Sequence, residues 1–192
     1  MAAGPSFTVP RLAQTYSHSV VDRAIMNAVN YLGYRQLTDE QREVVCTFLG
    51  GRNVFVSLPT GSGKSLCYAC LPLVFDALKT ASAEGDRDQR SIVVVLAPLT
   101  ALMQDQVASF REKGLSAACV GGRHCALQSV VGDEELVATG KAQLVYMTPE
   151  TVLSEPMWRE MVRSPTYRSN LVGLAIDEAH LVEKWSVIEH CF

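Results

Sequence analysis

The sequence LPTGSGKS, at residues 58–65, decides the fold of this chain. An apolar run at 54–56 precedes it, and a second apolar stretch follows it at 66–78. This order predicts a strand, a loop that binds phosphate, and a helix. Gly61 and Gly63 let the backbone turn tightly, so that its N–H groups and the positive end of the helix dipole face one anion.

The side chains around these glycines fit a nucleotide. Lys64 can reach the β- and γ-phosphates as a point charge, and the hydroxyl of Ser65 is placed to coordinate Mg²⁺. Ser62 completes the turn between the glycines. Leu58 stands where the strict P-loop pattern has glycine, but the turn glycines, the lysine and the metal-binding hydroxyl are all present. The alternative is a glycine- and serine-rich turn that contains a lysine by chance.

The amino-acid composition limits which classes of protein this chain can belong to. The 192 residues are 48% hydrophobic, which is enough for one domain with a real core. Seventeen basic and twenty acidic residues give a net charge of −3, so any nucleic-acid binding has to be local. The chain shows neither an N-terminal signal nor an apolar run long enough to span a membrane, so we expect no membrane partner.

The six cysteines are scattered without the spacing of a disulfide framework. This usage indicates a reducing intracellular compartment. Cys67 and Cys70 have CxxC spacing, but they fall among leucines in the helix expected after the phosphate loop. Nothing nearby supplies a second pair of ligands, so we expect core thiols rather than a redox pair or a zinc site.

Hydrophobic periodicity organises the rest of the chain. Residues 1–18 are predicted to be a flexible leader, 19–50 two amphipathic helices, and 51–192 a nucleotide-binding lobe. The β-branched run at 91–97 is typical of a strand buried on both faces. The pattern predicts an α/β fold, an open parallel sheet flanked by helices that binds ligand at its carboxyl edge. Further strands are expected at 117–120, 143–147 and 171–176, and further helices at 99–113, before Gly140 and from 149 to about 163.

An acidic pair, Asp177 and Glu178, follows the last predicted strand. Downstream of a phosphate loop, such a pair forms the second half of a nucleoside triphosphate site. Asp177 would hold Mg²⁺ opposite Ser65, and Glu178 would polarise the water that attacks the γ-phosphate. Taken alone, the pair could also be the solvated start of a helix. His180 has no second histidine at the spacing of a metal site and is expected to be a polar bridge.

Four motifs in order resemble the first RecA-like lobe of superfamily 2 helicases, and among those the RecQ family most closely. They are LPTGSGKSLCY, APLTALMQDQV, LVYMTPE and DEAH, and the similarity covers roughly residues 32–185. The resemblance implies a P-loop NTPase fold and ATP-driven unwinding of DNA with 3′-to-5′ polarity. ATP and Mg²⁺ would be the cofactors, and single-stranded or forked DNA the partner. Lys64 and Glu178 would be catalytic, and His180 would couple hydrolysis to DNA.

The segment GYRQLTDEQ resembles the adenine-reading segment of the family. The resemblance implies that the amide of Gln41 reads the adenine edge and that Tyr34 stacks on the ring. Simple packing is the alternative for Tyr34. Thr38 stands where the family usually has an arginine, which Arg35 could replace. Thr38 and Gln41 also have the spacing of a capping box, which predicts a helix start.

Thr100 and Thr148 resemble residues that hold successive phosphates of single-stranded DNA. By residue type alone, both are more often plain helix caps. Trp185 matches the tryptophan of an aromatic-rich loop that senses DNA in the family, whereas residues 186–192 depart from that pattern. We expect the chain to lack the sheet strand between those of the phosphate loop and DEAH, and a second RecA-like lobe.

The expected function is therefore the ATP-binding lobe of a helicase that does not unwind DNA alone. The absent lobe would carry an arginine finger, a group that contributes about 10³ to 10⁵ in rate. Two other classes stay open. A truncated, non-catalytic product could hold nucleotide or DNA, or compete for partners. A small P-loop kinase or GTPase would require neither DEAH nor APLTALMQDQ.

Overall fold

The computed structural model describes residues 16–81, 90–98, 100–121 and 132–178. The chain divides into two compact units, of which the N-terminal one ends at Ser91 and the C-terminal one begins at Ile92. Within the described residues, every helix is too short or too polar to cross a membrane.

The N-terminal unit is helical. Helix α1 packs against α4, and α2 packs against α3. The helix expected at 66–78 is interrupted at Cys70, because Pro72 has no N–H to donate to the carbonyl four residues earlier. The helices of this unit are α1 (His18–Tyr31), α2 (Asp39–Leu49), α3 (Lys64–Ala69) and α4 (Leu71–Ala81).

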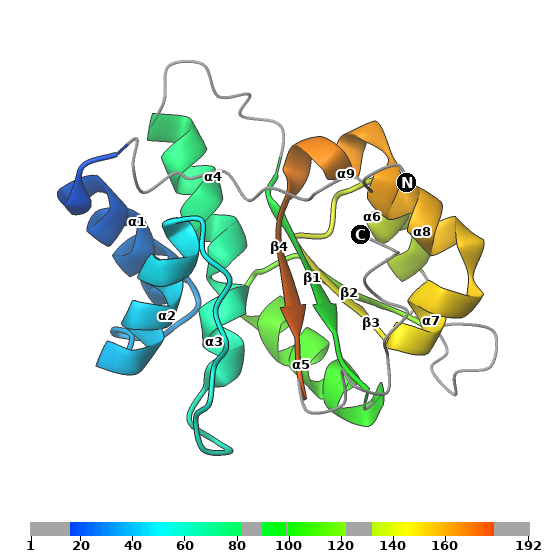
Figure 1. Ribbon diagram of the computed structural model, residues 1–192, viewed down its shortest axis with the longest axis horizontal. Coiled ribbons are helices and arrows are strands. Elements are labelled where there is room, and N and C mark those ends of the chain that lie inside the picture. The colour runs from blue at the N-terminus through cyan, green and yellow to red at the C-terminus, as the bar shows by residue number, and fades with distance from the viewer. Residues whose placement is uncertain (1–15, 82–89, 99, 122–131, 179–192) are drawn as a thin grey trace, which may run out of the picture. The chain divides into compact units, whose positions relative to one another are not determined.

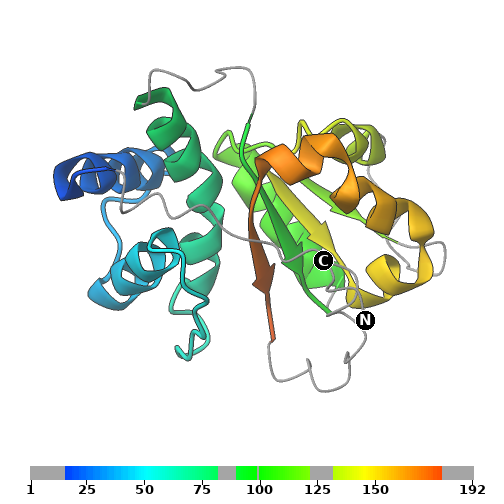
Figure 2. The same ribbon diagram turned by 45° about the horizontal axis from the view of Figure 1, so that its top comes forward.

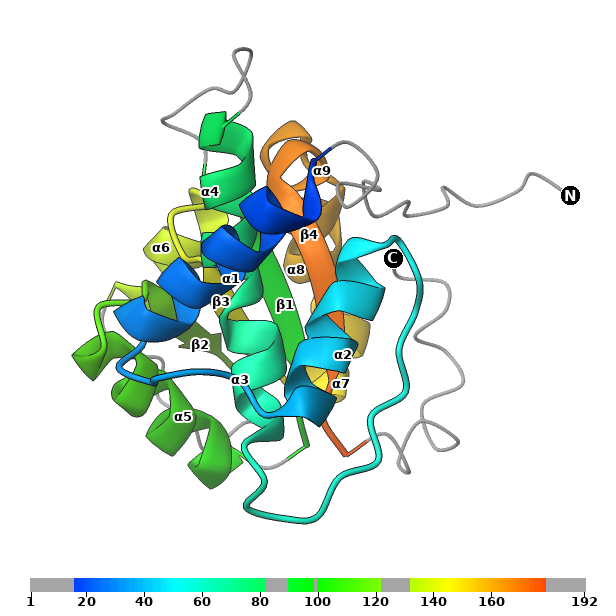
Figure 3. The ribbon, with the colours of Figure 1, turned by 90° about the vertical axis from the view of Figure 1, so that its left-hand side faces the viewer.

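The strand predicted at 54–56 is wrong. Residues 52–59 form no strand and lie in the long loop between α2 and α3 (Figure 3). Their burial nevertheless alternates as in an extended strand, since Val54 and Val56 are half-buried and Phe55 is 81% exposed. A strand also requires a backbone partner, and the apolar pattern alone does not supply one.

The C-terminal unit contains a parallel sheet with the strand order β2-β3-β1-β4 (Figure 2). The predicted open parallel α/β sheet is confirmed. β1 pairs with β3 on one side and β4 on the other, and all five of its residues are buried. The strands are β1 (Ile92–Leu96), β2 (Ala117–Val120), β3 (Leu144–Met147) and β4 (Leu171–Ile176).

Helices cover both faces of this sheet (Figure 1). Helix α5 lies against one face, where Gln106 accepts a hydrogen bond from the Tyr146 hydroxyl of β3 (2.8 Å). The other face packs against α6 to α9 through a core that includes Trp158 and Tyr167. The last helix, α9, was not predicted, although Pro165 after the capping Ser164 is a typical helix start. The helices are α5 (Thr100–Glu112), α6 (Asp133–Ala138), α7 (Pro149–Ser154), α8 (Pro156–Arg163) and α9 (Pro165–Asn170).

A buried ion pair fastens β2 to two of these helices. The carboxylate of Asp133, on α6, is 2% exposed and accepts hydrogen bonds from Arg111 of α5 and from the Cys119 N–H (3.1 Å). The Nε of Arg111 also donates to the carbonyl of Ala117 (2.7 Å). Removing Arg111 would leave the carboxylate of Asp133 uncompensated away from water, whereas the Arg111 side chain itself is 33% exposed.

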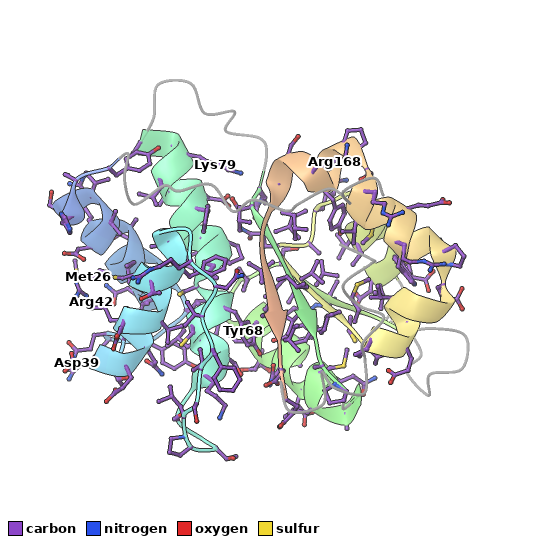
Figure 4. All side chains as sticks on the ribbon, viewed as in Figure 1. Met26, Asp39, Arg42, Tyr68, Lys79 and Arg168 are labelled. Carbon is purple, nitrogen blue, oxygen red and sulfur yellow. The ribbon has the colours of Figure 1, made fainter. Side chains whose placement is uncertain are left out.

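We expect Arg111→Met to lower the free energy of unfolding by about 3 kcal/mol, because the buried carboxylate of Asp133 loses its counter-charge. The matched control is Arg42→Met. Arg42, which lies on α2 (Figure 4), pairs with Asp22 at 2.6 Å. The side chains of Asp22 and Arg42 are 50% and 54% exposed. Loss of that surface pair should cost less than about 1 kcal/mol. Urea unfolding followed by circular dichroism measures both costs, and equal costs would contradict the structural role of the buried pair.

Candidate nucleotide-binding site

The phosphate loop, residues 58–65, has the tight turn that its glycines predict. Gly61 and Gly63 have φ values of +82° and +77°, in the left-handed region that favours glycine. The Ser62 N–H donates to the carbonyl of Pro59 (3.2 Å) and closes the turn. Gly63 then caps α3.

The lysine of the loop bonds to its own backbone. Lys64 Nζ donates to the carbonyls of Leu58 (2.9 Å) and Pro59 (3.1 Å). The hydroxyl of Ser62 is buried and has no hydrogen-bond partner among the described residues. The ammonium group of Lys64 and the unsatisfied hydroxyl of Ser62 are both donors that phosphate oxygens can accept from, so the loop fits a nucleotide.

Gln41 contacts this loop from the start of α2. Its Nε2 donates to the carbonyls of Ser62 (2.9 Å) and Gly63 (3.3 Å). Its Oε1 accepts the Thr38 N–H (3.0 Å), while its own N–H donates to the Thr38 hydroxyl (3.3 Å). The predicted capping box is confirmed. The contact with the loop was not predicted, because it joins residues 21 positions apart and no local pattern signals it.

Tyr34 is 41% exposed, and its N–H donates to the carbonyl of Val29 (3.1 Å). Its stacking on adenine stays a prediction, as does the reading of the adenine edge by Gln41.

The acidic pair lies in the C-terminal unit, directly after β4. The Asp177 N–H donates to the carbonyl of Leu96 (2.8 Å), and the Asp177 carboxylate accepts the Glu178 N–H (3.2 Å). Glu178 is exposed and has a φ of +58°, the only positive φ of a non-glycine residue in the described ranges. Such backbone strain is frequent at functional sites. Both side chains line a shallow depression beside the start of α5, together with Pro98, Leu102 and Gln106 among others.

The remaining predicted residues are placed as follows. Thr148 is 4% exposed, and its hydroxyl accepts the Thr151 N–H (3.1 Å), so it caps α7. This supports the capping alternative, and contact with DNA stays a prediction. Thr100 begins α5, but its side chain is outside the described part of the structure. His180 and Trp185 also lie outside the described residues.

The two cysteines of the CxxC pair are core thiols, as predicted. Cys67 is 6% exposed and Cys70 is fully buried. Burial raises the pKa of Cys67 to about 11 and raises the pKa of Cys70 well above its ordinary value. The described residues contain no group of three or more His, Cys, Asp or Glu side chains that could hold a metal ion.

A parallel sheet flanked by helices, with a glycine-turn phosphate loop earlier in the chain and an acidic pair at a strand end, is typical of the RecA-like helicase fold. The family model described as DEAD/DEAH box helicase matches residues 38–192. This chain belongs to the DEAD/DEAH box helicase family.

Several similar proteins are ATP-dependent helicases. The ATP-dependent DNA helicase RecQ of Synechocystis is 37% identical over 155 residues, which are 80% of this chain and 28% of that protein. The ATP-dependent helicase wrn-1 of Caenorhabditis elegans is 32% identical over 83% of this chain and 13% of its own length. The helicase hus2/rqh1 of Schizosaccharomyces pombe is 32% identical over 94% of this chain and 13% of its own. The chain thus spans less than a third of the length of each of these relatives.

The fold is similar to that of a solved helicase. The crystal structure of the DUF1998 helicase MrfA bound to DNA and AMPPNP matches with a TM-score of 0.63 at 20% identity. The match covers 85% of this chain and 22% of that one. At this identity the similarity establishes the RecA-like helicase fold.

The strain at Glu178 is testable by glycine substitution. Glycine adopts a left-handed backbone without penalty, so Glu178→Gly should be more stable than Glu178→Ala by about 1 kcal/mol. At Glu160, an exposed residue within α8, the order should reverse by a similar amount because glycine disfavours a helix. Urea unfolding of the four variants measures both differences, and the same sign at both positions would disprove the strain.

The buried thiols should resist alkylation. At pH 8, a thiol with a pKa of about 11 has a thiolate fraction of about 10⁻³, so Cys67 should react with iodoacetamide at least a hundredfold more slowly than a free cysteine. Mass spectrometry of digested protein gives the labelling rate at each cysteine. Labelling in urea is the control, since it should restore the rates, and rapid labelling of Cys67 or Cys70 in native protein would contradict their burial.

Proposed function

We propose that this chain is the ATP-binding lobe of a RecQ-like, ATP-dependent DNA helicase with 3′-to-5′ polarity. The observation that carries the proposal is the phosphate loop, in which Gly61 and Gly63 form a tight turn around Lys64 and the unsatisfied hydroxyl of Ser62. The similarity to RecQ helicases supports the choice of ATP and DNA over the substrates of other phosphate-loop enzymes.

Lys64 is proposed to exchange its backbone carbonyl partners for phosphate oxygens. Hydrogen bonds from a cation to an anion are about twice as strong as those to neutral acceptors, so the exchange favours the bound nucleotide. The loss of the contacts with Leu58 and Pro59 frees their carbonyls, which can turn to water because Pro59 is exposed. Binding of triphosphate would therefore reshape the loop around the same cation.

The metal and the attacking water are assigned to hydroxyl and carboxylate side chains. Ser65 and Asp177 are proposed to hold Mg²⁺, and Mg²⁺ neutralises charge on the phosphates when it is bound. Glu178 is proposed to orient and polarise the attacking water. Glu178 is exposed and has a left-handed backbone directly after β4. These features support a catalytic role for Glu178 rather than a packing role. His180 is proposed to link hydrolysis to DNA.

Single-stranded DNA is the proposed partner. The helicase MrfA, which has the same fold, was crystallised with DNA and AMPPNP. In this chain, helix α5 begins after β1, at the carboxyl edge of the sheet. Backbone N–H groups at helix starts suit phosphate without a basic surface, which agrees with the net charge of −3. Unwinding is proposed to require a second RecA-like lobe in addition to this chain.

The proposal predicts nucleotide binding that depends on Lys64. Saturating Mg-ATP, at about 100 times its Kd, should stabilise the wild-type chain by about 2.7 kcal/mol. Lys64→Ala should remove this effect, because the loop loses its cation. Lys141→Ala is the matched control, since Lys141 is an exposed lysine outside the phosphate loop, and it should keep the full stabilisation. Thermal unfolding with and without Mg-ATP measures all three.

The proposed ATP site would be contradicted if Mg-ATP did not stabilise the wild-type chain. It would also be contradicted if Mg-ATP stabilised the Lys64→Ala variant as much as the wild type. The DNA partner is tested separately by fluorescence anisotropy with a labelled single-stranded oligonucleotide. ATP-dependent separation of a DNA duplex by the 192-residue chain, abolished in Lys64→Ala, would refute the need for a second lobe.

A further inference from the structure

We propose that Gln41 is a positioning residue for phosphate binding, one that turns two backbone N–H groups of the phosphate loop toward the triphosphate. This inference rests on the proposed nucleotide site and assigns Gln41 a role that is independent of the adenine base.

Gln41 contacts two carbonyl groups of the phosphate loop. Its Nε2 lies 2.9 Å from the carbonyl oxygen of Ser62 and 3.3 Å from that of Gly63. The residue is only 5% exposed, so water competes little for these hydrogen bonds. Two successive carbonyls of the loop are therefore held by one amide.

Holding a carbonyl also fixes the N–H group that follows it. In a trans peptide the C=O and the next N–H point to opposite sides of the chain, and no described peptide bond is cis. The carbonyls of Ser62 and Gly63 face Gln41, so the N–H groups of Gly63 and Lys64 face away from it. Inward-facing N–H groups are the donors that a phosphate loop requires.

Gly63 shows how closely the two parts fit. A Cβ atom added to Gly63 would lie 2.9 Å from Nε2 of Gln41, which is closer than such contacts allow. Glycine at this position therefore serves both the left-handed backbone, with a φ of +77°, and the approach of the amide.

The capping box fixes which end of the amide faces the loop. Because Oε1 accepts the Thr38 N–H at 3.0 Å, the donor end of the side chain is directed to the carbonyls of the loop. The start of α2 thus sets the orientation of Gln41, and Gln41 sets the orientation of the loop.

A base-free ligand separates positioning from base reading. If Gln41 only reads adenine, its loss should abolish the preference for ATP over GTP and leave the binding of inorganic tripolyphosphate unchanged. If Gln41 orients the loop, its loss should weaken Mg-ATP and Mg-tripolyphosphate alike, because both depend on the same N–H groups.

Isothermal titration calorimetry on the full chain tests this with Gln41→Met, which keeps the length of the side chain and removes the donor. We expect Gln41→Met to weaken both Mg-ATP and Mg-tripolyphosphate about tenfold, as the loss of a pair of modest hydrogen bonds implies. Thr38→Val is the matched control. It removes the other half of the capping box, keeps the donor of Gln41, and should change both affinities less than about twofold. Circular dichroism at the assay temperature establishes that each variant is folded.

If Gln41→Met does not fold, Gln41→Glu replaces it, because a carboxylate keeps the acceptor for the Thr38 N–H and cannot donate to the loop. That variant should lose at least tenfold in affinity for both ligands. Unchanged tripolyphosphate affinity in the folded variant would overturn the inference about Gln41 but would not contradict the proposed nucleotide site. Absence of binding of both ligands to the wild-type chain would overturn the proposed site and this inference together.

Discussion

The backbone hydrogen bonds that hold β1 between β3 and β4 set the geometry of the C-terminal unit. Leu96 is in register with Met147 of β3 and with Ile176 of β4, so the three strands end at the same position along the sheet. Because all are parallel, the chain leaves each of them at the same edge, toward α5, α7 and the acidic pair. The motifs that resemble helicase motifs are far apart in sequence, and this register brings three of them to one edge. The fully buried sequence of β1 is what allows a strand to occupy that central position.

The N-terminal unit is organised by a different kind of constraint. Its phosphate loop is not part of a described strand, and its shape depends on two left-handed glycines and on polar side chains that hold its carbonyls. Lys64 holds the carbonyls at the beginning of the loop, and Gln41 holds those at its end. These few hydrogen bonds are modest in free energy, so a ligand that offers stronger acceptors to the lysine can reorganise the loop.

The sequence predicts this fold well where the determining interactions are local. The four strands of the sheet follow from short apolar runs, and the start of α2 follows from the capping-box spacing of Thr38 and Gln41. Prediction fails where a structural feature depends on a partner that is distant in sequence. The apolar run at 54–56 has the alternation of a strand but no described pairing, and the contact of Gln41 with the phosphate loop joins separate elements. The interruption before α4 is an exception, because Pro72 signals it locally.

The candidate site is also marked by departures from the rules that the core obeys. Glu178 has a left-handed backbone, which non-glycine residues rarely adopt. The hydroxyl of Ser62 is buried without a hydrogen-bond partner among the described residues, and the charged amino group of Lys64 donates to neutral carbonyls. Other buried polar atoms, those of Ser91 and Asn170, are also unsatisfied, so no single departure identifies a site. What distinguishes the phosphate loop is the combination of an unsatisfied hydroxyl, a cation and a glycine turn within a few residues. A stable fold alone does not require that combination, whereas an anionic ligand would satisfy each of its parts.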